Sequence, residues 1–137
     1  MPTGAGNRHP TQTLVATAAA WGLSTDLAPP RTPLPTEAWE PMLRKVAVTR
    51  TIGTLIAAMH AGEWPATDAQ WAAAEETHRT WMGVAIRLER ELVELGDRFD
   101  RVGVPFLVLK GSACAHLDYP APEWRCFGDG ELLVDAD

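Results

Sequence analysis

The chain has 137 residues, a formal net charge of −6 and a hydrophobic fraction of 46 %. This length supports one domain, or a small domain with an arm, and excludes two full hydrophobic cores. The apolar composition excludes a wholly disordered chain. The acidic balance argues against general nucleic-acid binding, because a surface that neutralises phosphates needs an excess of Lys and Arg.

The cytoplasm is the location expected from the sequence, and a membrane is not expected as a partner. The N-terminus lacks the pattern of a secretory signal, and no run approaches the about 18 apolar residues of a membrane span. Cys114 and Cys126 are the two cysteines. With His116 they form a weak zinc pattern that lacks a fourth ligand, so buried, reduced cysteines are expected instead.

The first third of the chain predicts an arm followed by a helix. Residues 1–35 are rich in Pro, Thr, Gly and Ala, which is typical of a partly disordered arm, here with a short helix over residues 14–23. A helix is then predicted from Thr36, as its N-cap, to Gly62. Gly53 weakens the middle of that helix by about 1 kcal/mol relative to alanine.

A long helix is predicted over residues 68–102, with Asp68 as its cap and Gly103 just after its end. Apolar and aromatic side chains recur along it every three or four residues. This stripe consists of His78, Trp81, Ala85, Leu88, Leu92, Leu95, Phe99 and Val102. Such a stripe suits either a homo-oligomeric coiled coil or packing inside its own domain. The second interpretation is favoured, since the stripe covers barely more than three heptads.

The apolar period changes after Gly103. Residues 104–109 form a continuous apolar run that predicts a strand buried on both faces. A helical turn or two is expected over residues 113–117, and a second strand begins at Glu131. The chain is therefore assigned to the α+β or α/β class, with a helical region over residues 36–102 followed by a β-α-β portion over residues 103–137.

A turn between strand and helix is the first candidate site. In Lys110-Gly111-Ser112 the glycine lets the backbone approach a ligand, and the N–H groups at a helix start favour an anion such as phosphate. Lys110 adds a positive charge and Ser112 a hydroxyl. Taken alone, such a turn is more often plain turn chemistry.

A pair of acids is the second candidate site. Asp129 and Glu131 stand two residues apart at the start of a strand, so their side chains are expected on the same face. Two carboxylates in this arrangement can share a divalent cation. Acids at a strand entrance usually face water, but the turn and the acid pair together would place phosphates and a metal at neighbouring strand ends.

Residues 103–137 resemble an uncharacterised family of the nucleotidyltransferase superfamily. That family has Gly-x-Pro before a hydrophobic strand, Leu-Lys-Gly, a helix of small residues, a Tyr-Pro loop, an Arg, and Gly-Asp-x-Asp before an apolar strand. The matching residues here are Gly103, Pro105, Leu109, Lys110, Gly111, Tyr119, Pro120, Arg125, Gly128 and Asp129. Two positions depart from the pattern, because Gly130 replaces a hydrophobic residue and Glu131 replaces the second Asp.

The resemblance implies transfer of a nucleoside monophosphate from a nucleoside triphosphate to an unknown acceptor, with release of pyrophosphate. Asp129 and Glu131 are the implied catalytic residues and the ligands of Mg²⁺ or Mn²⁺. Gly111 and Ser112 are expected to hold phosphates, and Lys110 and Arg125 to balance charge on the leaving group. Arg125 has an equal alternative, as a surface arginine packed on Trp124.

The family pattern also includes a third carboxylate on a later strand, which has no position in this sequence. We therefore expect an incomplete fold, from an N-terminal fragment or a truncated member. The alternative function is that of a catalytically inactive homologue, a helical interaction protein that docks through the stripe over residues 78–102.

Overall fold

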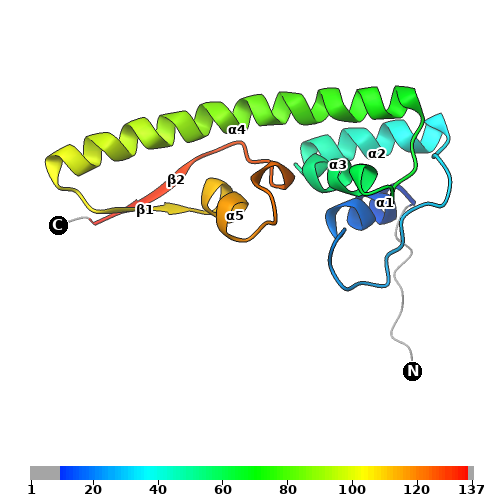
Figure 1. The fold of residues 1–137 in the computed structure, drawn as a ribbon, viewed down its shortest axis with the longest axis horizontal. Helices are drawn as coiled ribbons and strands as arrows, with labels where there is room; N and C mark the ends of the chain where they lie inside the picture. The colour runs from blue at the N-terminus through cyan, green and yellow to red at the C-terminus, as the bar shows by residue number, and fades with distance from the viewer. Residues whose placement is uncertain (1–9, 136–137) are drawn as a thin grey trace.

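A single long helix forms the spine of the molecule. The computed structural model describes residues 10–135, and α4 (Asp68–Val102) runs along its length (Figure 1). Beside the N-terminal half of α4 lie α1 (Pro10–Ala19), α2 (Thr36–Val48) and α3 (Ile52–His60). The remaining elements are β1 (Phe106–Leu109), α5 (Gly111–Leu117), the 3-10 helix η1 (Pro122–Trp124) and β2 (Glu131–Val134). A helical region followed by a small sheet confirms the predicted α+β class.

The predicted long helix is confirmed, but a different residue caps it. The Thr67 hydroxyl accepts a hydrogen bond from the backbone N–H of Gln70 (3.2 Å), and the Gln70 side chain accepts one from the Thr67 N–H (3.1 Å). This reciprocal capping box satisfies two of the donors that a helix start leaves free. Asp68, the predicted cap, is the first residue inside the helix. Gly103 ends the helix with a φ of 72°, as expected.

Thr67→Ala is expected to lower the free energy of unfolding by about 1 kcal/mol, because the capping hydroxyl is lost. Asp68→Ala removes only a charge that favours the helix start, and its effect should be smaller, about 0.5 kcal/mol. Urea denaturation of the two variants and the unchanged chain measures both values. A larger loss for Asp68→Ala would contradict the assignment of the cap.

The helix predicted over residues 36–62 is two helices, α2 and α3, with a sharp break between them. The Thr51 N–H donates to the Val46 carbonyl (3.0 Å) and the Arg50 N–H to the Ala47 carbonyl (3.1 Å). These two bonds end α2 in a Schellman motif, with Arg50 at the left-handed position (φ 59°) that glycine usually occupies. The sequence signal for such an end is a glycine, and its absence explains the prediction of one continuous helix.

The beginnings of α1 and α2 also differ from prediction. The helix expected over residues 14–23 lies nearer the N-terminus, as α1, and α2 has Pro35 rather than Thr36 as its N-cap. Residues 1–9 of the predicted arm lie outside the described residues. Within residues 10–135, none of the helices combines the length and apolar composition that a membrane crossing requires.

The main hydrophobic core lies where α1, α2 and α3 meet the N-terminal half of α4. Trp39 and Trp64 are buried in it, and Cys126 joins them from the C-terminal part of the chain. Burial raises the pKa of the Cys126 thiol to about 11, although a hydrogen bond from the Gly53 backbone opposes the shift. Both cysteines are free thiols, but the predicted burial holds for Cys126 alone, since Cys114 is half-buried.

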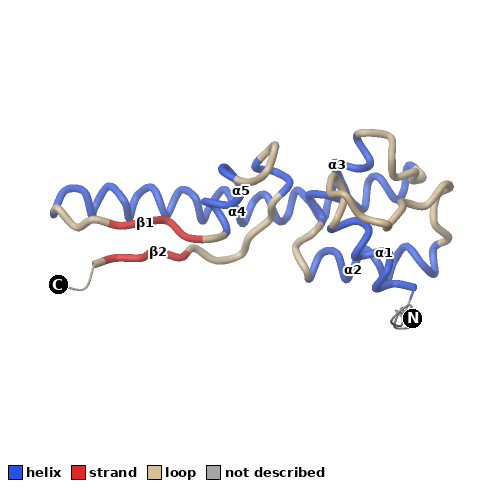
Figure 2. The backbone as a smooth tube through the Cα atoms, turned by 90° about the horizontal axis from the view of Figure 1, so that it is seen from below, coloured by secondary structure: helices blue, strands red, loops and turns tan. Residues whose placement is uncertain are grey.

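The two strands form a small antiparallel sheet along the C-terminal half of α4 (Figure 2). Leu109 pairs with Glu131 at one end and Phe106 with Val134 at the other. The prediction that the first strand is buried on both faces is wrong for the described chain, since Leu107 is 62 % exposed. One face of the sheet packs toward α4, and the other faces outward.

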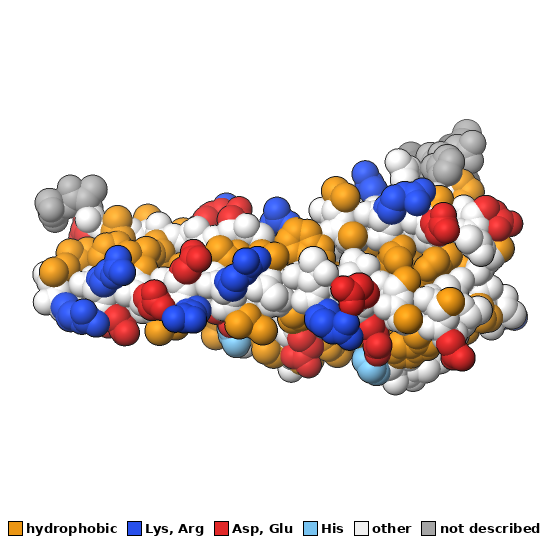
Figure 3. Space-filling view, turned by 90° about the horizontal axis from the view of Figure 1, so that it is seen from above, with side chains coloured by type: hydrophobic (Ala, Val, Ile, Leu, Met, Phe, Trp, Pro, Cys, Tyr) orange, Lys and Arg blue, Asp and Glu red, His pale blue; other side chains and the backbone are white. Residues whose placement is uncertain are grey.

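The apolar stripe of α4 packs largely against its own chain. Ala85 is buried with Ala115 and Phe127, and the rings of Phe99 and Phe106 lie 5.6 Å apart. The intramolecular interpretation of the stripe therefore agrees with the structure, and a dimer through this stripe would have to displace these contacts. The outer face of α4 carries charged side chains of both signs (Figure 3).

Candidate functional site

The turn between β1 and α5 has an unusual backbone at Lys110. Its φ of 52° and ψ of −128° belong to a region that side chains disfavour, at a cost of about 1–3 kcal/mol. The next residue, Gly111, is buried, and a Cβ there would lie 2.9 Å from the Cβ of Phe127. Glycine at 111 therefore allows the loop before β2 to pack directly on the start of α5.

Lys110 meets the predicted acids at the neighbouring strand end. Its Nζ lies 2.8 Å from Oε2 of Glu131, which pairs with Leu109 across the sheet. The hydrogen bond and charge of Glu131 raise the pKa of Lys110, and the charge of Asp129 adds to the effect. The structure thus brings Lys110, Asp129 and Glu131 together, as the sequence predicted, although Asp129 precedes the strand rather than lying on it.

Arg50 is a neighbour of the site that the sequence analysis missed. Its Nη1 lies 4.0 Å from Oδ1 of Asp129, and its guanidinium carbon lies 5.4 Å from the ring centroid of Trp81. A Cβ on Gly128 would lie 3.1 Å from that guanidinium carbon, so the glycine lets the chain pass close to Arg50. The sequence holds no local signal for this contact, because no glycine marks the helix end at Arg50 and the two residues are far apart in the chain.

The two ion pairs share one backbone feature. Among residues 10–135, Arg50 and Lys110 are the two residues other than glycine that have a positive φ. Each pairs with one of the two candidate metal ligands, Arg50 with Asp129 and Lys110 with Glu131. Both cations thus occupy backbone positions that disfavour a side chain, and Lys110 contacts its acid closely, whereas Arg50 lies 4.0 Å from Asp129.

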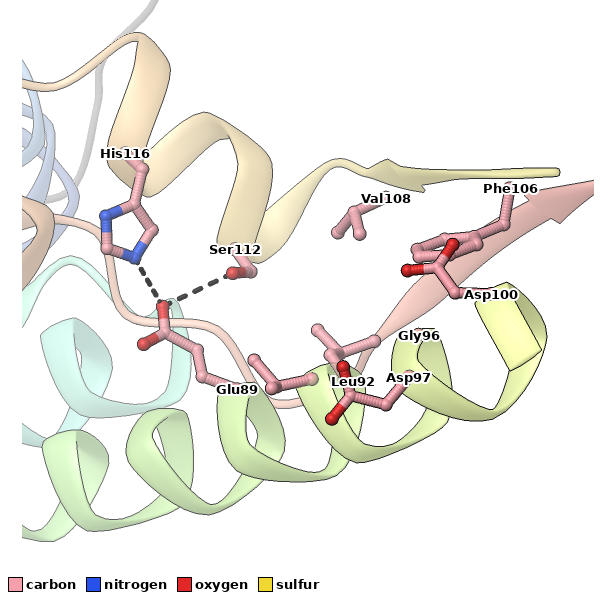
Figure 4. Close-up of a pocket in the computed structure, with 10 residues that line it drawn as sticks. Glu89, Leu92, Gly96, Asp97, Asp100, Phe106, Val108, Ser112 and His116 are labelled. Carbon is pink, nitrogen blue, oxygen red and sulfur yellow. Dashed lines mark hydrogen bonds and ion pairs between the residues drawn. The ribbon is translucent and has the colours of Figure 1, made fainter.

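Ser112 faces a different part of the molecule, a cleft of about 420 Å³ between α4, β1 and α5. Figure 4 shows Glu89 pointing from α4 toward Ser112 and His116 on α5. Oε1 of Glu89 accepts a hydrogen bond from the Ser112 hydroxyl (3.2 Å) and lies 2.7 Å from Nε2 of His116. The hydroxyl predicted to bind phosphate is therefore engaged by a carboxylate. Glu89 had no sequence signal, because it is one of many acids on α4.

Arg125 lines a second cleft. Its Nη1 donates to the Cys126 carbonyl, and the cleft that it lines also includes Trp124, Tyr119 and Arg50. The weak zinc pattern does not form a site among the described residues. No three His, Cys, Asp or Glu side chains gather there in a metal-binding arrangement.

A family model described as an uncharacterised nucleotidyltransferase matches residues 35–137, about three quarters of the chain. The chain belongs to this family. The match includes the turn at Lys110, the acid pair and Arg50, and it begins one residue before α2. No curated protein and no solved structure matches the chain.

Nucleotidyltransferases generally use divalent metal ions, and the acid pair of this family member suits such an ion. Mg²⁺ and Mn²⁺ prefer carboxylate oxygens, and Mg²⁺ often takes one or two of them together with substrate phosphates. The Asp129 side chain is 70 % exposed, so its oxygens are accessible. Because no third protein ligand is gathered in residues 10–135, the remaining ligands would be substrate or water oxygens.

Proposed function

We propose that this protein transfers a nucleoside monophosphate from a nucleoside triphosphate to an acceptor, with Asp129 and Glu131 as its catalytic carboxylates. Pyrophosphate is the leaving group, and Mg²⁺ or Mn²⁺ is the cofactor. One observation carries the proposal beyond family membership. Two cations with a positive φ accompany these same two acids: Lys110 lies 2.8 Å from Glu131, and Arg50 lies 4.0 Å from Asp129.

The family member's own residues suggest how the triphosphate is bound. Lys110 stays fully protonated at neutral pH and would balance the charge on the leaving pyrophosphate. Gly111, which packs against Phe127, would contribute only through its backbone at the start of α5, and Ser112 would donate its hydroxyl to a phosphate oxygen after turning away from Glu89. Arg125 would contact a phosphate from the adjoining cleft.

The metal supplies charge neutralisation and lowers the pKa of an acceptor hydroxyl when it is bound. The carboxylates of Asp129 and Glu131 would hold it, and their release from Arg50 and Lys110 frees both cations to contact substrate anions. We propose a cytoplasmic location and a small-molecule or macromolecular acceptor outside the membrane.

Asp129→Asn and Glu131→Gln are expected to abolish Mg²⁺-dependent binding of nucleoside triphosphates, because each removes a ligand charge. Isothermal titration with non-hydrolysable analogues of the four common triphosphates, with and without MgCl₂, measures this. Glu75→Gln, on the exposed face of α4, removes the same charge away from the site and should leave binding unchanged. Binding that ignores both the metal and Asp129→Asn would refute the proposal.

A helical interaction protein is the second candidate function. It is favoured by the outward face of the sheet, where Leu107 and its cross-strand partner Leu133 are 62 % and 55 % exposed. Exposed apolar side chains on neighbouring strands are typical of a surface that another element covers. The same titration separates the two candidates, since an interaction protein needs neither triphosphate nor metal.

A further inference from the structure

A second cleft, about 290 Å³ in volume, lies next to the acid pair on the side of the helical region. The break between α2 and α3 forms one wall of it, through Arg50 and Thr51. The loop around η1 forms the other, through Tyr119, Trp124 and Arg125. Residues far apart in the sequence thus build one pocket.

The charge of this pocket is positive. Two arginines, Arg50 and Arg125, line it, and no Asp or Glu is among its lining residues within the described chain. The Tyr119 hydroxyl adds a hydrogen-bond donor, and no partner for it is found in residues 10–135. Outside the lining, an oxygen of Asp129 lies 4.0 Å from Arg50, at the limit of an ion pair, and the Asp129 side chain is largely exposed. A pocket with two arginines and no lining carboxylate favours an anionic ligand.

Both guanidinium groups are held in place by neighbouring groups. Arg50 lies over the ring of Trp81 and against Gly128, and its backbone is fixed by the Schellman bonds that end α2. Arg125 uses one nitrogen to bind the Cys126 carbonyl. An arginine has five N–H donors in a rigid plane, so each side chain retains donors for a ligand.

We propose that Arg50 and Arg125 form a binding site for a phosphate group of a substrate, with Tyr119 as an additional donor. Two arginines bind the paired oxygens of a phosphate with good geometry. The bound phosphate group belongs either to the nucleoside triphosphate or to a phosphorylated acceptor. Asp129 lies next to Arg50, beside this site. The statement that this phosphate site lies beside a catalytic centre rests on the proposed function. The statement that Arg50 and Arg125 bind an anion does not depend on that function.

The backbone at Arg50 offers a test that separates binding from folding. Glycine is the preferred residue at a left-handed helix end, so Arg50→Gly is expected to leave the chain at least as stable while it removes the charge. Arg125→Gln removes the second charge. Arg44→Gln serves as the matched control, because Arg44 is an exposed arginine on α2, paired only with Glu40.

The full chain is titrated calorimetrically with sodium pyrophosphate and sodium phosphate in the absence of divalent metal. Arg50→Gly and Arg125→Gln are each expected to weaken pyrophosphate binding at least tenfold, and Arg44→Gln and Asp129→Asn to retain it. Equal binding by Arg50→Gly and the unchanged chain, or no binding by the unchanged chain, would overturn the proposal. Retention in Asp129→Asn separates this site from the metal-dependent one.

Competition identifies the source of the phosphate. A triphosphate analogue with Mg²⁺ that displaces pyrophosphate from Arg50 assigns the site to the nucleotide, whereas simultaneous binding assigns it to the acceptor. Both results support an anion site at Arg50 and Arg125. Pyrophosphate binding that depends on Arg50, together with no metal-dependent nucleotide binding, would retain this inference and refute the proposed reaction.

Discussion

Replacing Gly53 with alanine is expected to destabilise the protein by about 2 kcal/mol or more, although alanine is the better helix former. Gly53 lies in α3, where η1 packs against it with its backbone. A Cβ at this position would lie 2.6 Å from the carbonyl oxygen of Glu123 and would also meet that of Trp124. Carbonyl groups cannot rotate away as a flexible side chain can, so η1 would have to separate from α3.

Gly83→Ala is the matched control for this prediction. Gly83 lies on the exposed face of α4, and a Cβ there meets no atom within 4 Å. Alanine at this position should raise the free energy of unfolding by about 1 kcal/mol, because only the helix propensity changes. Urea denaturation of both variants measures the two effects. A stabilising Gly53→Ala would show that η1 does not pack on α3 as described.

Replacing Phe127 with alanine is expected to lower the free energy of unfolding by about 3–5 kcal/mol. Phe127 is only 2 % exposed and is the largest side chain of the cluster that joins α4 to α5. Its ring carbons lie where a Cβ on Gly111 would stand, so the ring holds the turn at Lys110 against the loop that carries Asp129. Its loss should also loosen the candidate site.

Leu117→Ala provides the comparison, because Leu117 is 81 % exposed at the end of α5. Its effect should stay within about 0.5 kcal/mol. Thermal and urea unfolding give the stabilities, and amide hydrogen exchange at residues 110–112 reports the turn. A small loss for Phe127→Ala, with unchanged exchange at that turn, would contradict the role of the ring as the link between α5 and the loop before β2.

The positions of most helices and strands were predictable from the sequence. The errors lie where tertiary packing determines the end of a helix or the role of a glycine. The long helix over residues 68–102 and the strand at Phe106–Leu109 follow from apolar period and a terminal glycine. The break at Arg50 did not follow, since the bonds that end α2 involve backbone groups and a residue that is uncommon at such an end. Gly53 was interpreted as a weak point of a helix, and its real role is to admit the backbone of η1.

Some residues of the candidate site were likewise predictable from the sequence, and others were not. Lys110, Asp129 and Glu131 could be selected from the sequence, because a glycine turn after one strand and acids before the next are local patterns. Arg50 stands 79 positions before Asp129, and nothing local connects the two residues. The contact of Ser112 with Glu89 was equally hidden, since it depends on which face of α4 lies over α5.

Local patterns in the chain were thus sufficient for the class of fold and the family, and they select the acid pair as a candidate, because period, turn chemistry and motif order are properties of neighbouring residues. The tertiary structure alone decided which cations meet those acids, which hydroxyl is engaged by a carboxylate, and where a positively charged pocket opens beside them. The physical reason is that ion pairs and close packing join residues that are distant in sequence, and their geometry arises only when α4 aligns the helical region with the sheet.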